Sequence, residues 1–290
     1  MSALGARHLI LRPGTPVMAR SPGVVQIGLA GPSACLPDDP AVRRLVDALR
    51  RPTGLDPAEA LPDAAADALR RLQDADLVVA AFLGEEPRPR ALTTLLAQFG
   101  PDAVRRHEAR VATRVVVHAA LALEPAVDAL LAEAGLPTTS DGDDPDAVHL
   151  VVSAGEVHRD ALDPLIRASR AHLLVGGDAA GVRIGPFVEP GRTACQRCVD
   201  AHESMHDPRR PLLLAQAAGQ AAAFPAPRDP LLDRLALAWA VRDLQRYAEG
   251  DEPSTWSATV DLGPATAPTI TPWGRHPYCG CSWDGFLDLP

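Results

Sequence analysis

Four of the five cysteines form two close pairs that lie far apart in the sequence. Cys195 and Cys198 are separated by two residues, and Cys279 and Cys281 by one. In a reducing compartment, cysteines clustered in this way bind metal more often than they form disulfides. Four thiolates on two tight turns make a closed tetrahedral site, and sulfur ligands favour zinc over magnesium or calcium. We therefore predict that these four cysteines bind one structural zinc ion.

The sequence leaves other interpretations of these residues open. Two disulfides or unrelated buried thiols are compatible with the spacing, although cysteines one or two residues apart make poor crosslinks. His202, His206 and His276 are candidate substitute ligands, and the first two are four residues apart on a predicted helix. Because four cysteines are available, we expect these histidines to be solvated. Cys35 lies in the turn-rich segment GPSACLPDDP, and we assign it no role.

Composition excludes several classes of chemistry. The net charge of -9 disfavours a nucleic-acid backbone as the main partner. All 28 basic residues are arginine, so a lysine nucleophile, a Schiff-base lysine and a phosphate-binding lysine are all excluded. No apolar run approaches the roughly 20 residues that span a bilayer, and the N-terminus lacks the pattern of a signal peptide. We therefore expect a cytoplasmic protein.

The first 83 residues combine three strand-like segments with three predicted helices. The strands lie in RHLILRP, TPVMAR and GVVQIGL, punctuated by Pro-Gly and Gly turns. The helices lie in DDPAVRRLVDALRR, LDPAEAL and PDAAADALRRLQDADLVV. This order predicts a small winged-helix-like domain over residues 1–83. A charged, proline-containing linker and a further helix are predicted over residues 84–108.

Residues 109–290 alternate between predicted strands and helices. TRVVVHAAL and DAVHLVVSAG read as buried strands, and the helix between them begins near Pro125 and ends before Gly135. Further helices are predicted in HRDALDPLIRASRA, RPLLLAQAAGQAAAF and DPLLDRLALAWAVRDLQRYAEG. Further strands are predicted in HLLVGGDAAGVRIGPFVEPG, TWSATVDL and TAPTITPW. Short connections between strand and helix predict a mostly parallel, doubly wound sheet.

Three segments resemble a known family. HLLVGGDAAGVRIGPFVEPGRTACQRCVDAH is similar to the strand, Gly-Pro turn, Pro-Gly turn and CxxC of ThiF-like proteins in thiazole/oxazole-modified peptide pathways. These proteins are relatives of ubiquitin-activating enzymes. HPYCGC resembles the second half of their zinc site, and RSPGVVQIGL with the helices after it resembles a PqqD-like recognition element for ribosomally made peptides. The resemblance covers most of the chain. It implies an α/β fold in which the winged-helix-like domain precedes a degenerate Rossmann-like, ThiF-type domain with a structural zinc site.

The function implied by this resemblance is non-catalytic. The chain would bind the leader of a precursor peptide and present the peptide to a YcaO-type cyclodehydratase for azoline or azole formation. The resemblance also implies a homodimer through the ThiF-like domain. One alternative is an ATP-dependent adenylating enzyme, but the turn from His118 to Pro125 lacks glycine and the chain lacks lysine. A peptide-binding or dimerisation module outside such a pathway is a third possibility.

The resemblance also implies where the peptide binds. An extended leader adds as a strand to an exposed sheet edge, through main-chain hydrogen bonds. We expect this edge in the segment from Val24 to Leu29, which comprises Val24, Val25, Gln26, Ile27, Gly28 and Leu29. The helix over residues 63–74 would form the opposite wall, with Ala66, Arg70 and Gln73 lining it and Arg70 facing an acidic leader residue. Without the resemblance, the same residues read as an ordinary core strand and surface helix.

Overall fold

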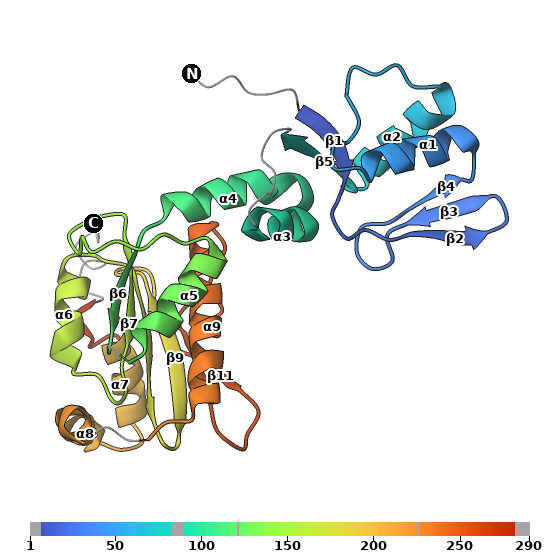
Figure 1. Ribbon diagram of the computed structural model, residues 1–290. Coiled ribbons are helices and arrows are strands. Elements are labelled where there is room, and N and C mark those ends of the chain that lie inside the picture. Colours follow the sequence, from blue (N-terminus) through green and yellow to red (C-terminus); the bar gives the residue numbers. More distant parts are fainter. Residues whose placement is uncertain (1–6, 83–89, 121, 225–226, 282–290) are drawn as a thin grey trace, which may run out of the picture. The chain divides into compact units, whose positions relative to one another are not determined.

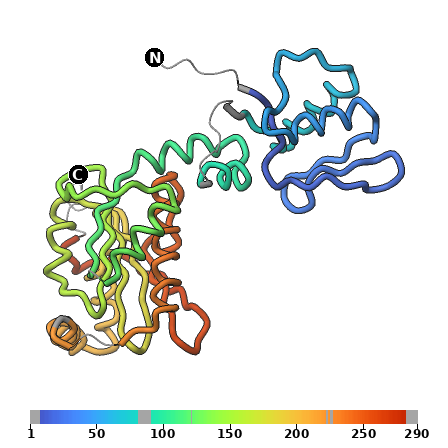
Figure 2. Tube along the Cα trace, viewed as in Figure 1, coloured from blue at the N-terminus to red at the C-terminus, as the bar shows by residue number. Residues whose placement is uncertain are grey.

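The computed structural model describes residues 7–82, 90–120, 122–224 and 227–281 (Figures 1 and 2). The chain divides into two compact units, Met1–Glu108 and Ala109–Pro290. No helix among the described residues combines the length and the apolar character needed to cross a bilayer.

In the first unit, two small sheets and the helices α1 and α2 share one core. Its elements are β1 (Arg7–Leu11), β2 (Val17–Ser21), β3 (Val24–Ile27), β4 (Ala34–Pro37), α1 (Pro40–Leu49), α2 (Asp63–Asp74) and β5 (Val78–Phe82). Strands β2, β3 and β4 form an antiparallel sheet in that order, and β1 pairs with β5. Asp39 caps α1 by accepting a hydrogen bond from the Ala41 N–H at 2.7 Å. Ile27, Leu36, Leu49 and Leu72 are buried together beneath the helices.

The predicted pattern of three strands followed by three helices is wrong for this unit. The segment LDPAEAL is not helical, because Asp56 accepts a hydrogen bond from the Ala58 N–H at 2.9 Å and forms a local turn. Leu55 instead exchanges backbone hydrogen bonds with Leu9 at 2.7 and 2.8 Å. The prediction also missed β4 and β5. Strand β5 follows α2 after Asp76, which adopts a left-handed conformation with φ of 54°.

Two further helices follow in the segment predicted as a linker and a helix. They are α3 (Arg90–Phe99) and α4 (Ala103–Ala112), joined by the short 3-10 helix η1 (Gly100–Asp102). Leu95 and Leu96 of α3 pack with Ile10 and Val79 in a second small core. Helix α3 is thus part of the first unit. Residues 84–89 of the predicted linker lie outside the described residues.

The second unit is built on one six-stranded mixed sheet. Its strands are β6 (Val115–Ala119), β7 (Val148–Val152), β8 (His172–Asp178), β9 (Gly181–Val188), β10 (Ala258–Leu262) and β11 (Thr269–Pro272). They lie side by side in sequence order. The first three are parallel, whereas β9, β10 and β11 join antiparallel, so the prediction of a mostly parallel sheet is wrong. The link between β8 and β9 is too short for a parallel crossover, which requires a dozen or more residues.

Helices cover both faces of this sheet. They are α5 (Glu124–Ala134), α6 (Arg159–Arg167), α7 (Gln196–Ser204), α8 (Arg210–Ala223) and α9 (Pro230–Ala248). Helices α5 and α9 lie side by side in front of the sheet (Figure 1), where Leu131 and Leu237 pack on Leu150 and Val175. Helix α5 begins with Pro125 in its first turn and ends at Gly135, as the sequence predicts.

Candidate functional site

The structure brings the four paired cysteines together. Their sulfur atoms all lie within 4.8 Å of one another. The separations are 3.8 Å for Cys195–Cys198, 3.5 Å for Cys195–Cys279 and 3.4 Å for Cys198–Cys281. A disulfide bond is about 2.05 Å long, whereas four sulfurs about 2.3 Å from a tetrahedral zinc ion are about 3.8 Å apart. The spacing therefore fits four ligands around one metal ion.

Two loops hold the cysteines in place. Cys195 caps α7 and Cys198 lies in its first turn, where the Cys198 N–H donates to the Cys195 carbonyl at 2.9 Å. On the other loop, the Cys279 N–H donates to the His276 carbonyl at 2.9 Å. Arg275 joins the two loops, because its guanidinium donates to the Gly191 carbonyl at 2.7 Å and to the Cys281 carbonyl at 2.9 Å. The site thus closes the C-terminal segment onto α7.

Burial and mutual hydrogen bonding change the acidity of these thiols. Cys195, Cys198 and Cys279 are buried. The hydrogen bond between Cys195 and Cys198 raises the pKa of the first thiol and lowers the pKa of the second to about 7. A metal ion would replace the thiol protons and remove the repulsion among four thiolates. With four protein ligands available, such a site is structural and leaves no position for a substrate.

The nearby histidines are not in the cluster. The Nε2–H of His202 donates to the Gly274 carbonyl at 2.9 Å. The rings of His202 and His276 are in contact, with centroids 5.0 Å apart. Both residues are half-buried and His206 is exposed.

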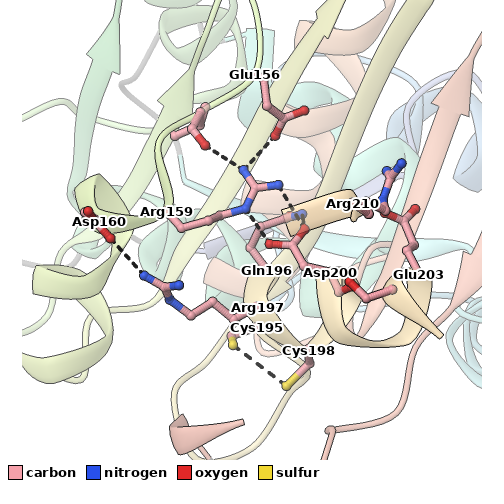
Figure 3. Close-up of polar contacts among 12 residues, drawn as sticks. Glu156, Arg159, Asp160, Cys195, Gln196, Arg197, Cys198, Asp200, Glu203 and Arg210 are labelled. Atoms are coloured by element: carbon pink, nitrogen blue, oxygen red, sulfur yellow. Dashed lines mark hydrogen bonds and ion pairs between the residues drawn. The ribbon is translucent and has the colours of Figure 1, made fainter. Parts of the chain in front are cut away.

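A polar network lies beside the cysteine cluster. Arg159 binds both carboxylate oxygens of Asp200, at 2.5 and 2.9 Å, and contacts Glu156 at 2.6 Å (Figure 3). Gln196 also donates to Asp200, at 3.1 Å. These groups come from α6, α7 and the loop after β7. One guanidinium faces two carboxylates, so Arg159 is fully paired and holds α6 to α7 without offering a free cation.

A second arginine lies at the carboxyl ends of β7 and β8. Arg228 donates to the Ser153 carbonyl at 2.5 Å and to the Gly177 carbonyl at 3.3 Å, and it pairs with Asp233. Its side chain is buried, with 7% of its area exposed. The arginine therefore occupies the edge of the sheet at which open α/β folds bind ligands.

The segment predicted to bind peptide is not at a sheet edge. Strand β3 pairs with β2 on one side and with β4 on the other, so the main-chain groups of Val24–Ile27 are used within the sheet. The prediction of an exposed edge at Val24–Leu29 is therefore wrong. It failed because β4 was not recognised from the sequence. A contact of the peptide with side chains of this segment stays a prediction.

Strand β4 forms the open edge beside α2. The Asp38 N–H donates to the Gly23 carbonyl at 2.9 Å, and this fixes which residues of β4 bond to β3. Because such bonds alternate along an antiparallel pair, the N–H and C=O of Cys35 point away from the sheet. The opposite edge, β2, carries an irregularity in its pairing between Ala19 and Ser21. A bulged edge is a poor template for a further strand.

Helix α2 meets this edge through an arginine that sequence reasoning did not select. Arg71 donates from Nη2 to the Cys35 carbonyl at 2.7 Å. With 3.6 residues per turn, Ala66, Arg70 and Gln73 lie roughly 100–160° around the helix from Arg71. They are therefore not on the flank that reaches β4. Their assignment to a peptide site stays a prediction.

Three histidines on neighbouring strands are a further feature that the sequence analysis did not use. His149 pairs in register with His172, and His149 Nδ1 lies 2.9 Å from His118 Nε2. Burial lowers the pKa of His149 and that of His172 to about 4 each. The signal in the sequence is a histidine inside each of three apolar strands. Their side chains share the face opposite to α5 and α9.

Comparison of the structure with known proteins shows the fold. Neither a family model nor a curated protein matches the sequence. A heterocyclase solved with substrate and cofactor has a TM-score of 0.71 at 15% identity, over 95% of this chain and 39% of that chain. The heterocyclase TruD has a TM-score of 0.67 at 16% identity, over 95% of this chain and 43% of that chain. The chain therefore spans about two fifths of the length of these heterocyclases.

E. coli MccB is similar over nearly its whole length. Its structure with succinimide has a TM-score of 0.60 at 13% identity, over 95% of this chain and 99% of that chain. MccB has also been solved with ATP, and that structure has a TM-score of 0.58. The mixed α/β fold of this chain is thus shared with heterocyclases and with MccB.

Proposed function

We propose that this chain binds an extended segment of a precursor peptide along β4 and presents the peptide to a separate YcaO-type cyclodehydratase. The observation that carries the proposal is the open edge of β4 beside α2, where Cys35 directs its N–H and C=O away from the sheet. Main-chain groups at such an edge bind an extended peptide by adding it as a further strand. The fold shared with heterocyclases supports a role in this pathway.

The second unit acts as a scaffold in this proposal. Nucleotides bind open α/β sheets where the strand order reverses, but β6 to β11 lie in sequence order without a reversal. Arg228 occupies the carboxyl ends of β7 and β8. The turn after β6 lacks the glycines that let backbone amides approach phosphates. These features favour a non-catalytic partner. The proposal also places the protein in the cytoplasm and a structural zinc ion on the four cysteines, whose sulfurs lie within 4.8 Å of one another.

A second candidate is an adenylating enzyme. The observation in its favour is that the fold is shared with MccB over 99% of the MccB chain. MccB has been solved with ATP. The two candidates differ in one measurement. An adenylating enzyme would release pyrophosphate from ATP in the presence of its peptide, whereas a presenting scaffold would not.

The test of the peptide site uses two substitutions at one position of the full chain. Cys35→Pro removes the outward N–H without removing a bond between β3 and β4, whereas Cys35→Ala changes only an exposed side chain. Binding of fluorescein-labelled precursor peptides, from genes beside YcaO genes, would be followed by anisotropy. We expect Cys35→Pro to weaken binding about fivefold to tenfold, as for the loss of one hydrogen bond, and Cys35→Ala to leave it unchanged. Equal binding by all three proteins would place the peptide elsewhere.

A further inference from the structure

An unpaired arginine lies at the open edge. Arg71 is exposed, and no carboxylate lies within ion-pair distance of its guanidinium among the described residues. The preceding residue differs, because Arg70 pairs with Asp67 at 2.7 Å on the same helix. The hydrogen bond from Arg71 to the Cys35 carbonyl uses one of the five guanidinium donors. The helix therefore places a cation with unused donors directly at the edge of β4.

The contact involves the carbonyl that an added strand would need. An incoming peptide donates an N–H to the Cys35 carbonyl and accepts from the Cys35 N–H. A carbonyl oxygen has two lone pairs, so Arg71 can share it or move to a new partner. In either case the guanidinium stays beside the incoming strand. A peptide that offers only apolar groups would remove water from the Arg71 guanidinium without supplying hydrogen-bond acceptors in its place, and this desolvation weakens binding.

The register fixes which peptide side chain meets the arginine. Leu36 is buried beneath the helices, and Cys35 is exposed on the other face. Side chains alternate along a strand, so the peptide residue opposite Cys35 points away from α2, and its neighbours point towards α2. The side chain adjacent to Arg71 thus belongs to a residue next to the one that pairs with Cys35. A carboxylate at that position can accept two hydrogen bonds from the guanidinium.

We propose that Arg71 selects peptides with an aspartate or glutamate at this helix-facing position. The inference rests on the proposed function, since it concerns the same edge. Arg71 has two effects there. In the absence of a peptide it protects the edge, because an exposed charge opposes indiscriminate strand pairing. In the presence of an acidic peptide it becomes an ion-pair partner, and the register of the peptide is set by the carboxylate.

The test selects peptides from a random twelve-residue display library on immobilised full-length protein. Four proteins are compared: wild type, Arg71→Glu, the matched control Arg70→Glu, and Cys35→Pro, which blocks the edge. We expect acidic residues to be enriched at one position with wild type and Arg70→Glu, and basic residues with Arg71→Glu. Resynthesised wild-type ligands in which the acid is replaced by its amide should bind about fivefold more weakly, as for an exposed ion pair.

The outcomes separate the inference from the proposed function. Peptides that bind through the edge, as shown by their loss with Cys35→Pro, but have the same charge pattern with wild type and Arg71→Glu would refute the role of Arg71 alone. No enrichment with any protein, or equal enrichment with Cys35→Pro, would refute peptide binding at β4 and the inference with it. Circular dichroism of each variant confirms that a lost signal is not lost folding.

Discussion

His149 should make the second unit sensitive to acid, and this can be tested with one substitution. The side chain is 1% exposed, and burial, with the nearby charges of His118 and Arg170, lowers its pKa to about 4. The ordinary pKa of 6.5 applies in the unfolded chain. Above pH 6.5 the histidine is neutral in both states and stability does not depend on it. As the pH falls from 6.5 towards 4, only the unfolded state gains a proton, so the free energy of unfolding decreases.

The size of the effect follows from the two pKa values. With 6.5 in the unfolded chain and about 4 in the folded one, linkage gives a loss of about 2 kcal/mol at pH 5 and about 3 kcal/mol at pH 4. His149→Leu removes the titrating group. The variant should therefore lose about 2 kcal/mol less stability than wild type between pH 7.5 and pH 5. His172, whose pKa is also lowered to about 4, leaves part of the acid sensitivity in place.

Tryptophan fluorescence during urea unfolding measures this loss in the relevant unit. All four tryptophans lie between residues 239 and 283, and thus in the second unit. The exposed His206, replaced by glutamine, provides the control. Metal content is measured at both pH values, because protonation of thiols also releases metal. Identical losses of stability in wild type and His149→Leu, at equal metal content, would show that His149 is protonated in the folded protein and refute the reasoning.

Three further predictions concern the metal centre and ATP. Cys198→Ser should abolish stoichiometric zinc binding and lower the urea midpoint of the second unit. By elemental analysis, Cys35→Ser should retain one zinc ion per chain. A zinc-free wild type in which all four thiols can be titrated would contradict this prediction. Arg275→Gln removes the bridge between the two cysteine loops and should lower the affinity for zinc about tenfold to a hundredfold. Competition with a chelator measures this affinity, and an unchanged value would show that the bridge is dispensable. Calorimetry should detect no ATP binding, and a clear signal or pyrophosphate release with any peptide would instead support the adenylating enzyme.

Features that depend on local chemistry were predictable from the sequence. The paired spacing of Cys195, Cys198, Cys279 and Cys281 identified four residues whose sulfurs converge in the structure. Helix α5 was bounded by its proline and glycine, because these residues act on the backbone within one turn. Such signals need no knowledge of the rest of the fold. The distance of more than 80 residues between the cysteine pairs did not weaken them.

Features that depend on pairing between distant segments were not predictable. Strand β4 has the sequence ACLP, which is short and ends in proline, and it reads as part of a turn. Once it was missed, β3 was taken for an edge. The antiparallel half of the larger sheet was missed for a related reason. The buried strands β8 and β9 have similar apolar sequences, and their direction is set by a turn of two residues.

The cysteine cluster has a consequence for the order in which the second unit forms. Cys198 and Cys281 are 83 residues apart, and the chain between them contains α8, α9, β10 and β11. A metal ion bound by both pairs converts this stretch into a closed loop, which restricts the unfolded chain by about 4–5 kcal/mol if it acts as a disulfide of that span would. During synthesis, Cys195 and Cys198 emerge several seconds before their partners, since ribosomes add about 5–20 residues per second. Until then only two of the four cysteine ligands are present, and the sheet lacks the strands that follow α9. A metal ion held by all four cysteines would therefore be captured only in the last stage of folding, after the second cysteine pair has been synthesised.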